Sequence, residues 1–174
     1  KSGTTNPEAY DLTQRAKSLM DERSKNSIAR AIELFEQAID LDADYADAYA
    51  FLGITHADSS SVSIAYPKVA FSKAKSAYEK CLEIDPFHPI ALSGLAEIAI
   101  VIEWDLNKAN HLLDRAIKRN SNDPNTISIY AAFYMAIGDS KKMATMAMRG
   151  IESDPKSAFI HQVYAVAEYF NGKM

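Results

Sequence analysis

The sequence predicts an all-α solenoid of four helical hairpins followed by a terminal helix. Two apolar patterns with helical spacing recur along the chain, and the last three copies of both keep a period of 34 or 35 residues. Gly and Pro number only six each in 174 residues, so long irregular loops are not expected. Because one hairpin cannot bury its apolar face alone, its stability depends on its neighbours.

The first pattern is a small residue, a large residue four positions later and a small residue three further on. Residues at these spacings share one face of a helix, so the pattern marks the second helix of each hairpin. The last copy is the weakest, because Met and Gly replace two of the Ala positions. The copies are Ala31, Phe35 and Ala38; Ala74, Tyr78 and Cys81; Ala109, Leu113 and Ala116; and Met143, Ala147 and Gly150.

The second pattern places a large residue beside Gly or Ala and marks the first helices. A small residue there lets two helix backbones approach closely. Ala96, Ala131 and Ala165 are 35 and 34 apart, but Gly53 precedes Ala96 by 43. We therefore expect a longer inter-helix loop at residues 59–63. The copies are Tyr49, Leu52, Gly53 and His56; Leu92, Leu95, Ala96 and Ala99; Ile127, Tyr130, Ala131 and Tyr134; and His161, Tyr164, Ala165 and Glu168, with Leu12, Arg15, Ala16 and Leu19 as a looser first member.

Capping residues indicate where helices begin. Asn6 and Asp123 each stand before a Pro, and Asp105 and Asp139 stand before further apolar segments. Gly138 suits a left-handed turn at the end of the preceding helix. The expected helices are 7–23, 26–41, 45–58, 67–84, 88–102, 106–119, 124–137, 140–153 and 157–171.

These residues together resemble the tetratricopeptide-repeat family, whose repeat of about 34 residues carries large–large–small–aromatic, then Ala–aromatic, then Pro. The resemblance covers nearly the whole chain and implies a right-handed solenoid. Ala43 and Ser121 replace the terminal Pro of two repeats. It implies one domain spanning residues 1–174, with repeats at about 7–43, 45–86, 88–121 and 124–155 and a terminal helix at 157–171.

In that family the first helices line a groove that binds peptides. The groove carried over to this chain is mostly small, apolar or acidic. Family members that grip C-terminal carboxylates use groove Lys, Arg and Asn, whereas this groove has Lys17 and an opposing Glu97, so we argue against that class of partner. The expected groove residues are Asp47, Ala50, Ile54, Asp58, Ile90, Ser93, Glu97, Ile100, Asn125, Ser128 and Met135, together with Lys17, Met20, Gln162 and Tyr169.

A narrower resemblance concerns residues 6–12, 31–39, 44–50 and 103–117. They are similar to repeat regions that follow a winged-helix DNA-binding domain or an adenylate-cyclase domain in bacterial regulators. This implies a signal-receiving, protein-binding region whose partner is a protein, a peptide or another domain of the same protein. Self-association as a homodimer and small-ligand sensing remain alternatives, and a cytoplasmic location is favoured, with a periplasmic one left open.

Composition excludes several other classes. The net charge is −4, and clustered Lys and Arg for nucleic acid are lacking. No apolar run reaches the roughly 20 residues of a membrane span. Residues 1–6 are polar, unlike a signal peptide, and the first residue is not Met, so we expect a piece of a longer protein.

No motif for catalysis, a cofactor or a metal stands out. The four histidines form no metal-binding pair, and the single Cys81 occupies a small-residue packing position. The turn residue Trp104 is a candidate contact for a partner. We expect it instead to pack against the next hairpin, because a large aromatic seldom stays fully exposed.

Replacing Phe35 by Ala is expected to destabilise the fold by about 3–5 kcal/mol, because the ring is assigned to the core between hairpins. Thermal or urea unfolding measures the change. An unchanged melting curve would contradict the core assignment.

Overall fold

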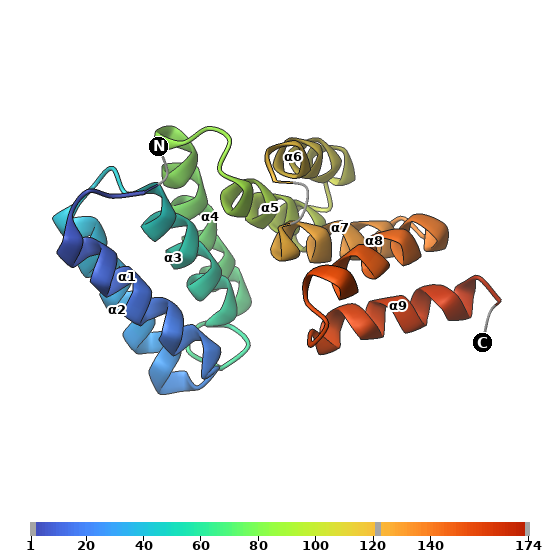
Figure 1. Cartoon of the computed structure of the whole chain (residues 1–174), viewed down its shortest axis with the longest axis horizontal. Helices are drawn as coiled ribbons and strands as arrows, with labels where there is room; N and C mark the ends of the chain where they lie inside the picture. The colour runs from blue at the N-terminus through green and yellow to red at the C-terminus, as the bar shows by residue number, and fades with distance from the viewer. Residues whose placement is uncertain (1–2, 121–122, 173–174) are drawn as a thin grey trace. The chain divides into compact units, whose positions relative to one another are not determined.

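The computed structural model describes residues 3–120 and 123–172. Within that part every regular element is a helix, which confirms the all-α class (Figure 1). The chain divides into two compact units, Lys1–Gly94 and Leu95–Met174, with the boundary inside one helix. The elements are α1 (Pro7–Asp21), α2 (Lys25–Leu41), α3 (Ala46–Asp58), α4 (Pro67–Ile84), α5 (Pro89–Ile98), the π-helix η1 (Ala99–Glu103), α6 (Leu106–Arg119), α7 (Pro124–Ala136), α8 (Ser140–Ser153) and α9 (Ala158–Phe170).

The expected helices agree with these bounds to within two residues, except at η1, and the expected caps are present. The side chains of Asn6 and Asp123 accept hydrogen bonds from backbone N–H groups of the first turns of α1 and α7. Asp105 and Asp139 do the same for α6 and α8. Gly138 has φ +74°, the left-handed conformation expected at the end of α7. Ser121, a departure from the family pattern, lies outside the described residues.

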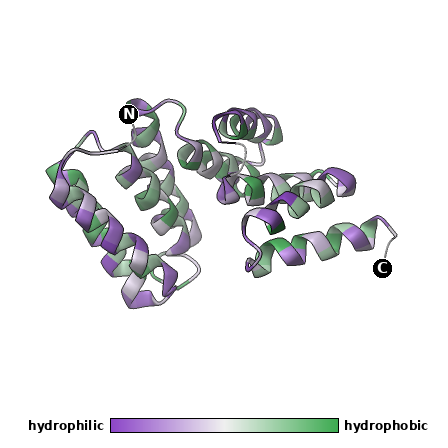
Figure 2. Ribbon diagram, in the orientation of Figure 1, coloured by the Kyte–Doolittle hydropathy of each residue, from purple (hydrophilic) through white to green (hydrophobic). Residues whose placement is uncertain are grey.

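In the first unit, two hairpins stack through their helices. The two helices of each hairpin pack together, α1 on α2 and α3 on α4, and α2 also packs on α3. The segment between α3 and α4 is the expected longer loop, and the Ile64 N–H donates to the Ser59 carbonyl at 2.9 Å to fold it back. Hydrophobic and hydrophilic residues alternate along most of the helices (Figure 2), and the helices pair by burying the hydrophobic ones.

The core of the first unit is organised around large residues of the second helices. Phe35 and Tyr78 are 0% and 2% exposed. A Cβ atom added to Gly53 of α3 would lie 2.3 Å from Tyr78 Cε1, and one added to Gly94 of α5 would lie 2.2 Å from Tyr78 Cζ. The Tyr78 ring therefore lies between two helices at two glycines. Gly53 was expected to face a partner helix; the contribution of Gly94 was not foreseen.

The second unit also packs large residues against small ones, but at its α8/α9 contact the small residue lies on the second helix. Helix α6 packs on α7, α7 on α8, and α8 on α9. Leu113, Ile127 and Ile160 are buried in its core. A Cβ atom on Gly150 of α8 would lie 2.4 Å from Ile160 Cγ1, so a small residue again allows close approach of two helices. The Tyr130 hydroxyl donates to Asp114, which ties α7 to α6.

One element was not expected from the sequence. The helix that begins as α5 ends in the π-helix η1 rather than continuing as α-helix to residue 102. Ala96 and Ala109 are 13 residues apart, whereas the equivalent Ala131 and Met143 are 12 apart. A π-turn takes up one extra residue without breaking the helix, so η1 accommodates this insertion.

No helix in the described residues is long and apolar enough to cross a bilayer.

Replacing Gly94 by Ala is expected to destabilise the fold by about 1–3 kcal/mol, because the new methyl group overlaps the Tyr78 ring. In a Tyr78→Leu background the same change should be neutral or stabilising by up to about 1 kcal/mol, because Ala favours helix over Gly. Urea unfolding of the four proteins in this cycle checks the sign reversal. An equal cost in both backgrounds would show that Tyr78 does not occupy the space beside Gly94.

Candidate binding faces on the first helices

The first helices of successive hairpins come together within each unit. Helix α1 contacts α3 in the first unit, and α7 contacts α9 in the second. These contacts create two faces, which we call the α1/α3 face and the α7/α9 face. Both carry expected groove residues that remain accessible.

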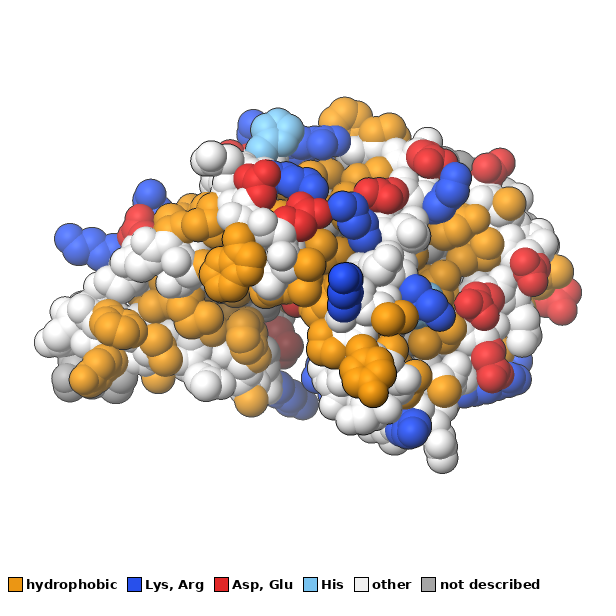
Figure 3. Space-filling view, turned by 180° about the vertical axis from the view of Figure 1, so that it is seen from behind, with side chains coloured by type: hydrophobic (Ala, Val, Ile, Leu, Met, Phe, Trp, Pro, Cys, Tyr) orange, Lys and Arg blue, Asp and Glu red, His pale blue; other side chains and the backbone are white. Residues whose placement is uncertain are grey.

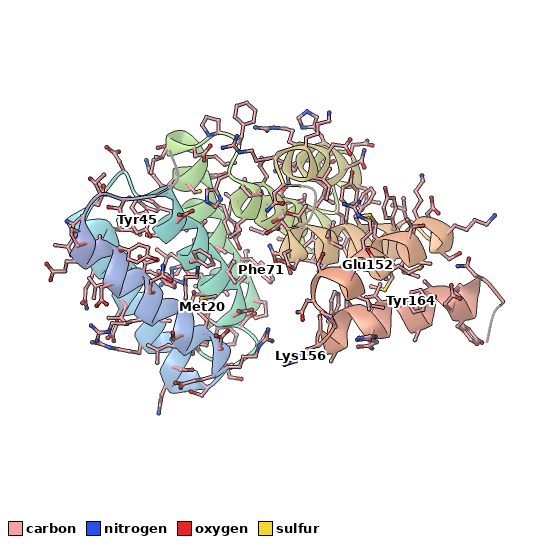
Figure 4. All side chains as sticks on the ribbon, in the orientation of Figure 1. Met20, Tyr45, Phe71, Glu152, Lys156 and Tyr164 are labelled. Carbon is pink, nitrogen blue, oxygen red and sulfur yellow. The ribbon has the colours of Figure 1, made fainter. Side chains whose placement is uncertain are left out.

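The α1/α3 face joins residues from two hairpins. Lys17 and Met20 of α1 and Ile54 and Asp58 of α3 are all half-buried. Met20 lies near the end of α1 (Figure 4) and packs against the core of this unit. The accessible surface of this face is therefore a mixture of apolar and charged groups.

Phe51 occupies the middle of this face and was missed by the sequence analysis. Its ring stacks on that of Phe35, with centroids 6.2 Å apart, and the Lys17 ammonium lies 4.3 Å from its centroid on the opposite helix. Phe51 stands three residues before Ile54, so it shares a face of α3 with that expected groove residue, and helical spacing would have found it. The Lys17 charge is thus held at the centre of the face.

Asp47 is fixed by a histidine from outside its own hairpin. His88 Nε2 lies 2.8 Å from Asp47 Oδ1; the side chains are 4% and 33% exposed. Because His88 directly precedes α5, this contact ties the start of α5 to the first turn of α3. No described residue bonds His88 Nδ1.

Three expected groove residues do not offer surface to a partner. Ala50, Ser93 and Ile100 are 0%, 0% and 9% exposed, which corrects the expectation for these positions. Helical phase predicts which residues share a face, but it does not predict how closely the next helix covers that face. Ile90 and Glu97 are half-buried.

The α7/α9 face is more apolar and more open. Met135 and Tyr169 are 47% and 66% exposed, and Gln162 is also exposed, whereas Asn125 and Ser128 are half-buried. Hydrophobic side chains gather over the C-terminal helices at the left of Figure 3. Extending the pattern along α9 would also have found two exposed aromatics, Phe159 and Phe170.

Trp104 corrects another expectation. Its side chain is 80% exposed, so it does not pack against the next hairpin. It follows the π-helix with φ +56°, a left-handed conformation that is strained for a residue other than Gly. Val101 and Ile102 beside it are each 44% exposed.

The buried titratable groups His56 and Cys81 lie in the core rather than in an open site. Burial lowers the pKa of His56 from 6.5 to about 4, with a smaller effect from the Lys73 charge. Burial likewise raises the pKa of the Cys81 thiol to about 12, so it is not a reactive thiolate. In residues 3–120 and 123–172, no group of three His, Cys, Asp or Glu side chains is placed to hold a metal ion.

Stacked amphipathic hairpins with open first-helix faces define a class of helical-repeat proteins. A family model for the tetratricopeptide repeat matches residues 71–88, within the second hairpin and the turn that follows it. Comparison with the curated proteins finds no match.

Solved structures share the fold at low sequence identity. A thermophilic tetratricopeptide-repeat protein in Thermus thermophilus matches with a TM-score of 0.76 and 16% identity, over 94% of this chain and 82% of that one. MamA residues 41-end from Desulfovibrio magneticus match with a TM-score of 0.62 and 13% identity, over 98% of this chain and 89% of that one. YrrB is described as a tetratricopeptide-repeat protein with an unusual peptide-binding site. It matches with a TM-score of 0.54 and 21% identity, over 95% of this chain and 78% of that one. The chain therefore has the fold of the tetratricopeptide-repeat proteins, and its second hairpin carries a recognisable repeat.

Acidification is expected to destabilise the fold through His56. The unfolded chain binds a proton at this residue below pH 6.5, but the folded chain does so only below about pH 4. Stability is therefore lost as the pH falls from 6.5 to 4, by roughly 3 kcal/mol, and the loss levels off below pH 4. Urea unfolding across this range measures it.

The matched control is His56→Leu, which should have a flatter pH profile. Burial raises the pKa of Asp58 and works in the opposite direction, but this effect is common to both proteins. Parallel profiles would contradict a buried neutral His56.

Proposed function

We propose that this chain is a protein-interaction module that binds a polypeptide segment on its first-helix faces. The observation that carries the proposal is the group of large apolar side chains left accessible on the α7/α9 face: Met135, Phe159 and Tyr169. Their exposed surface adds nothing to the core of the second unit. Large apolar side chains exposed on one face are a feature of interaction sites, and Met and aromatic residues are enriched in interfaces.

The polar residues of the same face suit a polypeptide guest. Ser128 and Gln162 offer a hydroxyl and an amide, groups that can bond the backbone N–H and C=O of a bound chain. Apolar side chains would supply most of the affinity, and these polar groups would set the register. The matched family is a repeat of the kind that binds proteins or peptides, and YrrB is described as having a peptide-binding site.

At a finer level, we propose that the module is the signal-receiving region of a bacterial transcriptional regulator. The support is the resemblance at residues 6–12, 31–39 and 103–117 to repeats that follow a DNA-binding domain. In that setting the partner is another protein or a neighbouring domain, and its binding would alter the activity of the attached domain.

Self-association is the second candidate, and the same exposed face favours it. A second copy could cover Met135 and Tyr169 as well as a foreign segment could. Light scattering of the chain alone distinguishes the two. Self-association would give an average mass near twice that of the monomer at micromolar concentration, and this average mass would fall on dilution.

Replacing Met135 by Lys is expected to reduce partner capture at least tenfold, because a charge is placed on the apolar face; a tenfold loss corresponds to about 1.4 kcal/mol. Affinity capture from an extract of the source organism, followed by quantitative mass spectrometry, measures the loss for each captured protein.

The matched control is Met148→Lys, at a methionine of α8 that is 52% exposed outside the α7/α9 face. It should capture the same proteins as the unaltered chain. Equal capture by Met135→Lys and the unaltered chain would rule out the α7/α9 face as the binding surface.

A further inference from the structure

Four residues of α3 form one continuous stripe on the α1/α3 face. Asp47, Phe51, Ile54 and Asp58 follow one another at intervals of four, three and four residues, so their side chains leave the helix in nearly the same direction. All four are half-buried. The stripe therefore has a carboxylate at each end and an apolar centre.

The carboxylate at the start of the stripe has acceptor capacity left. Asp47 Oδ1 lies 2.8 Å from His88 Nε2, and the buried imidazole holds the carboxylate in place. Throughout the described residues, no Lys or Arg forms an ion pair with Asp47. Its other oxygen is therefore available for a hydrogen bond from a partner.

The carboxylate at the end of the stripe is similar. Burial raises the pKa of Asp58, and this effect exceeds the opposing effect of the Arg23 charge. No ion pair of Asp58 with a cation occurs in residues 3–120 and 123–172. A partly buried carboxylate without a paired cation favours a cationic ligand, because the attraction is less screened than on an open surface.

The centre of the stripe already has a cation of its own. The Lys17 ammonium lies over the Phe51 ring, 4.3 Å from its centroid. A further cation at this point would be repelled, whereas an apolar side chain can pack on Phe51 and Ile54. The charge pattern therefore restricts the cations of a partner to the two ends.

The spacing of the carboxylates sets the spacing of those cations. Eleven residues of α-helix separate Asp47 from Asp58, a rise of about 16 Å. An extended chain covers that distance in about five residues.

We propose that the α3 stripe binds an extended polypeptide segment with two Lys or Arg residues about five positions apart and apolar residues between them. This rests on the proposed function and names the chemistry of one partner segment. Each cation meets one carboxylate, and the intervening side chains lie on Phe51 and Ile54. His88 acts as a positioning residue for Asp47.

The test uses two octapeptides of identical composition, acetylated and amidated. The first reads Gly-Lys-Leu-Ala-Val-Leu-Lys-Gly, with its lysines five positions apart. The second reads Gly-Leu-Ala-Lys-Lys-Val-Leu-Gly, with its lysines adjacent. Titration of the isotope-labelled chain by NMR gives both the dissociation constant and the residues perturbed. We expect the first peptide to bind roughly threefold or more tightly than the second and to perturb amides of α3.

Two substitutions test the carboxylates directly. Asp47→Asn and Asp58→Asn are each expected to raise the dissociation constant of the spaced peptide roughly threefold or more. The control Asp40→Asn, at an exposed residue of α2, should leave it unchanged. Because the peptide comparison uses the unaltered chain, it stands even where a variant folds poorly.

Equal binding of the two peptides, or perturbation away from α3, would overturn the inference. If capture of a partner is still reduced by Met135→Lys in that case, the proposed function stands and only the inference about the α3 stripe fails. If capture is unaffected by Met135→Lys but the spaced peptide binds α3, the α7/α9 face is not the binding surface, whereas the inference about the α3 stripe stands.

Discussion

The structure of the first unit depends on the fit of one large side chain of each second helix against small or flat surfaces on neighbouring first helices. Tyr78 of α4 shows this most clearly, because its ring lies against Gly53 of its own hairpin and Gly94 of the next. Phe35 of α2 makes the equivalent contact by stacking on Phe51 of α3. Neither hairpin buries its ring without the other, so the stability of each repeat is shared with its neighbour.

This division of roles leaves the first helices with a free side. In the first unit, α2 and α4 carry Phe35 and Tyr78, which fill the core, whereas α3 supplies glycine and alanine toward that core and other residues away from it. On α3 the other residues include Asp47 and Asp58, and on α7 and α9 they include Met135 and Tyr169. The two faces thus differ in chemistry, one charged at its ends and the other apolar. A single scaffold therefore carries two kinds of accessible surface.

Much of this arrangement follows from local sequence. Caps such as Asn6 and Asp139 and the period of the small residues predict the helices and their pairing, because these signals act within one turn or one hairpin. The π-helix was missed, although the 13-residue interval from Ala96 to Ala109 records its extra residue. The packing predicted for Trp104 came from the general tendency of large aromatic side chains to be buried. That tendency takes no account of the extra residue just before Trp104. The burial of Ala50, Ser93 and Ile100 depends on how neighbouring segments cover them, which periodicity does not report.

Hydrogen–deuterium exchange of the full chain with and without a captured partner tests the central claim most directly. Added protection is expected in first helices, within Ala46–Asp58 or within Pro124–Ala136 and Ala158–Phe170, because the accessible faces lie there. The second helices Lys25–Leu41, Pro67–Ile84, Leu106–Arg119 and Ser140–Ser153 should exchange as before. Protection confined to the second helices would contradict it.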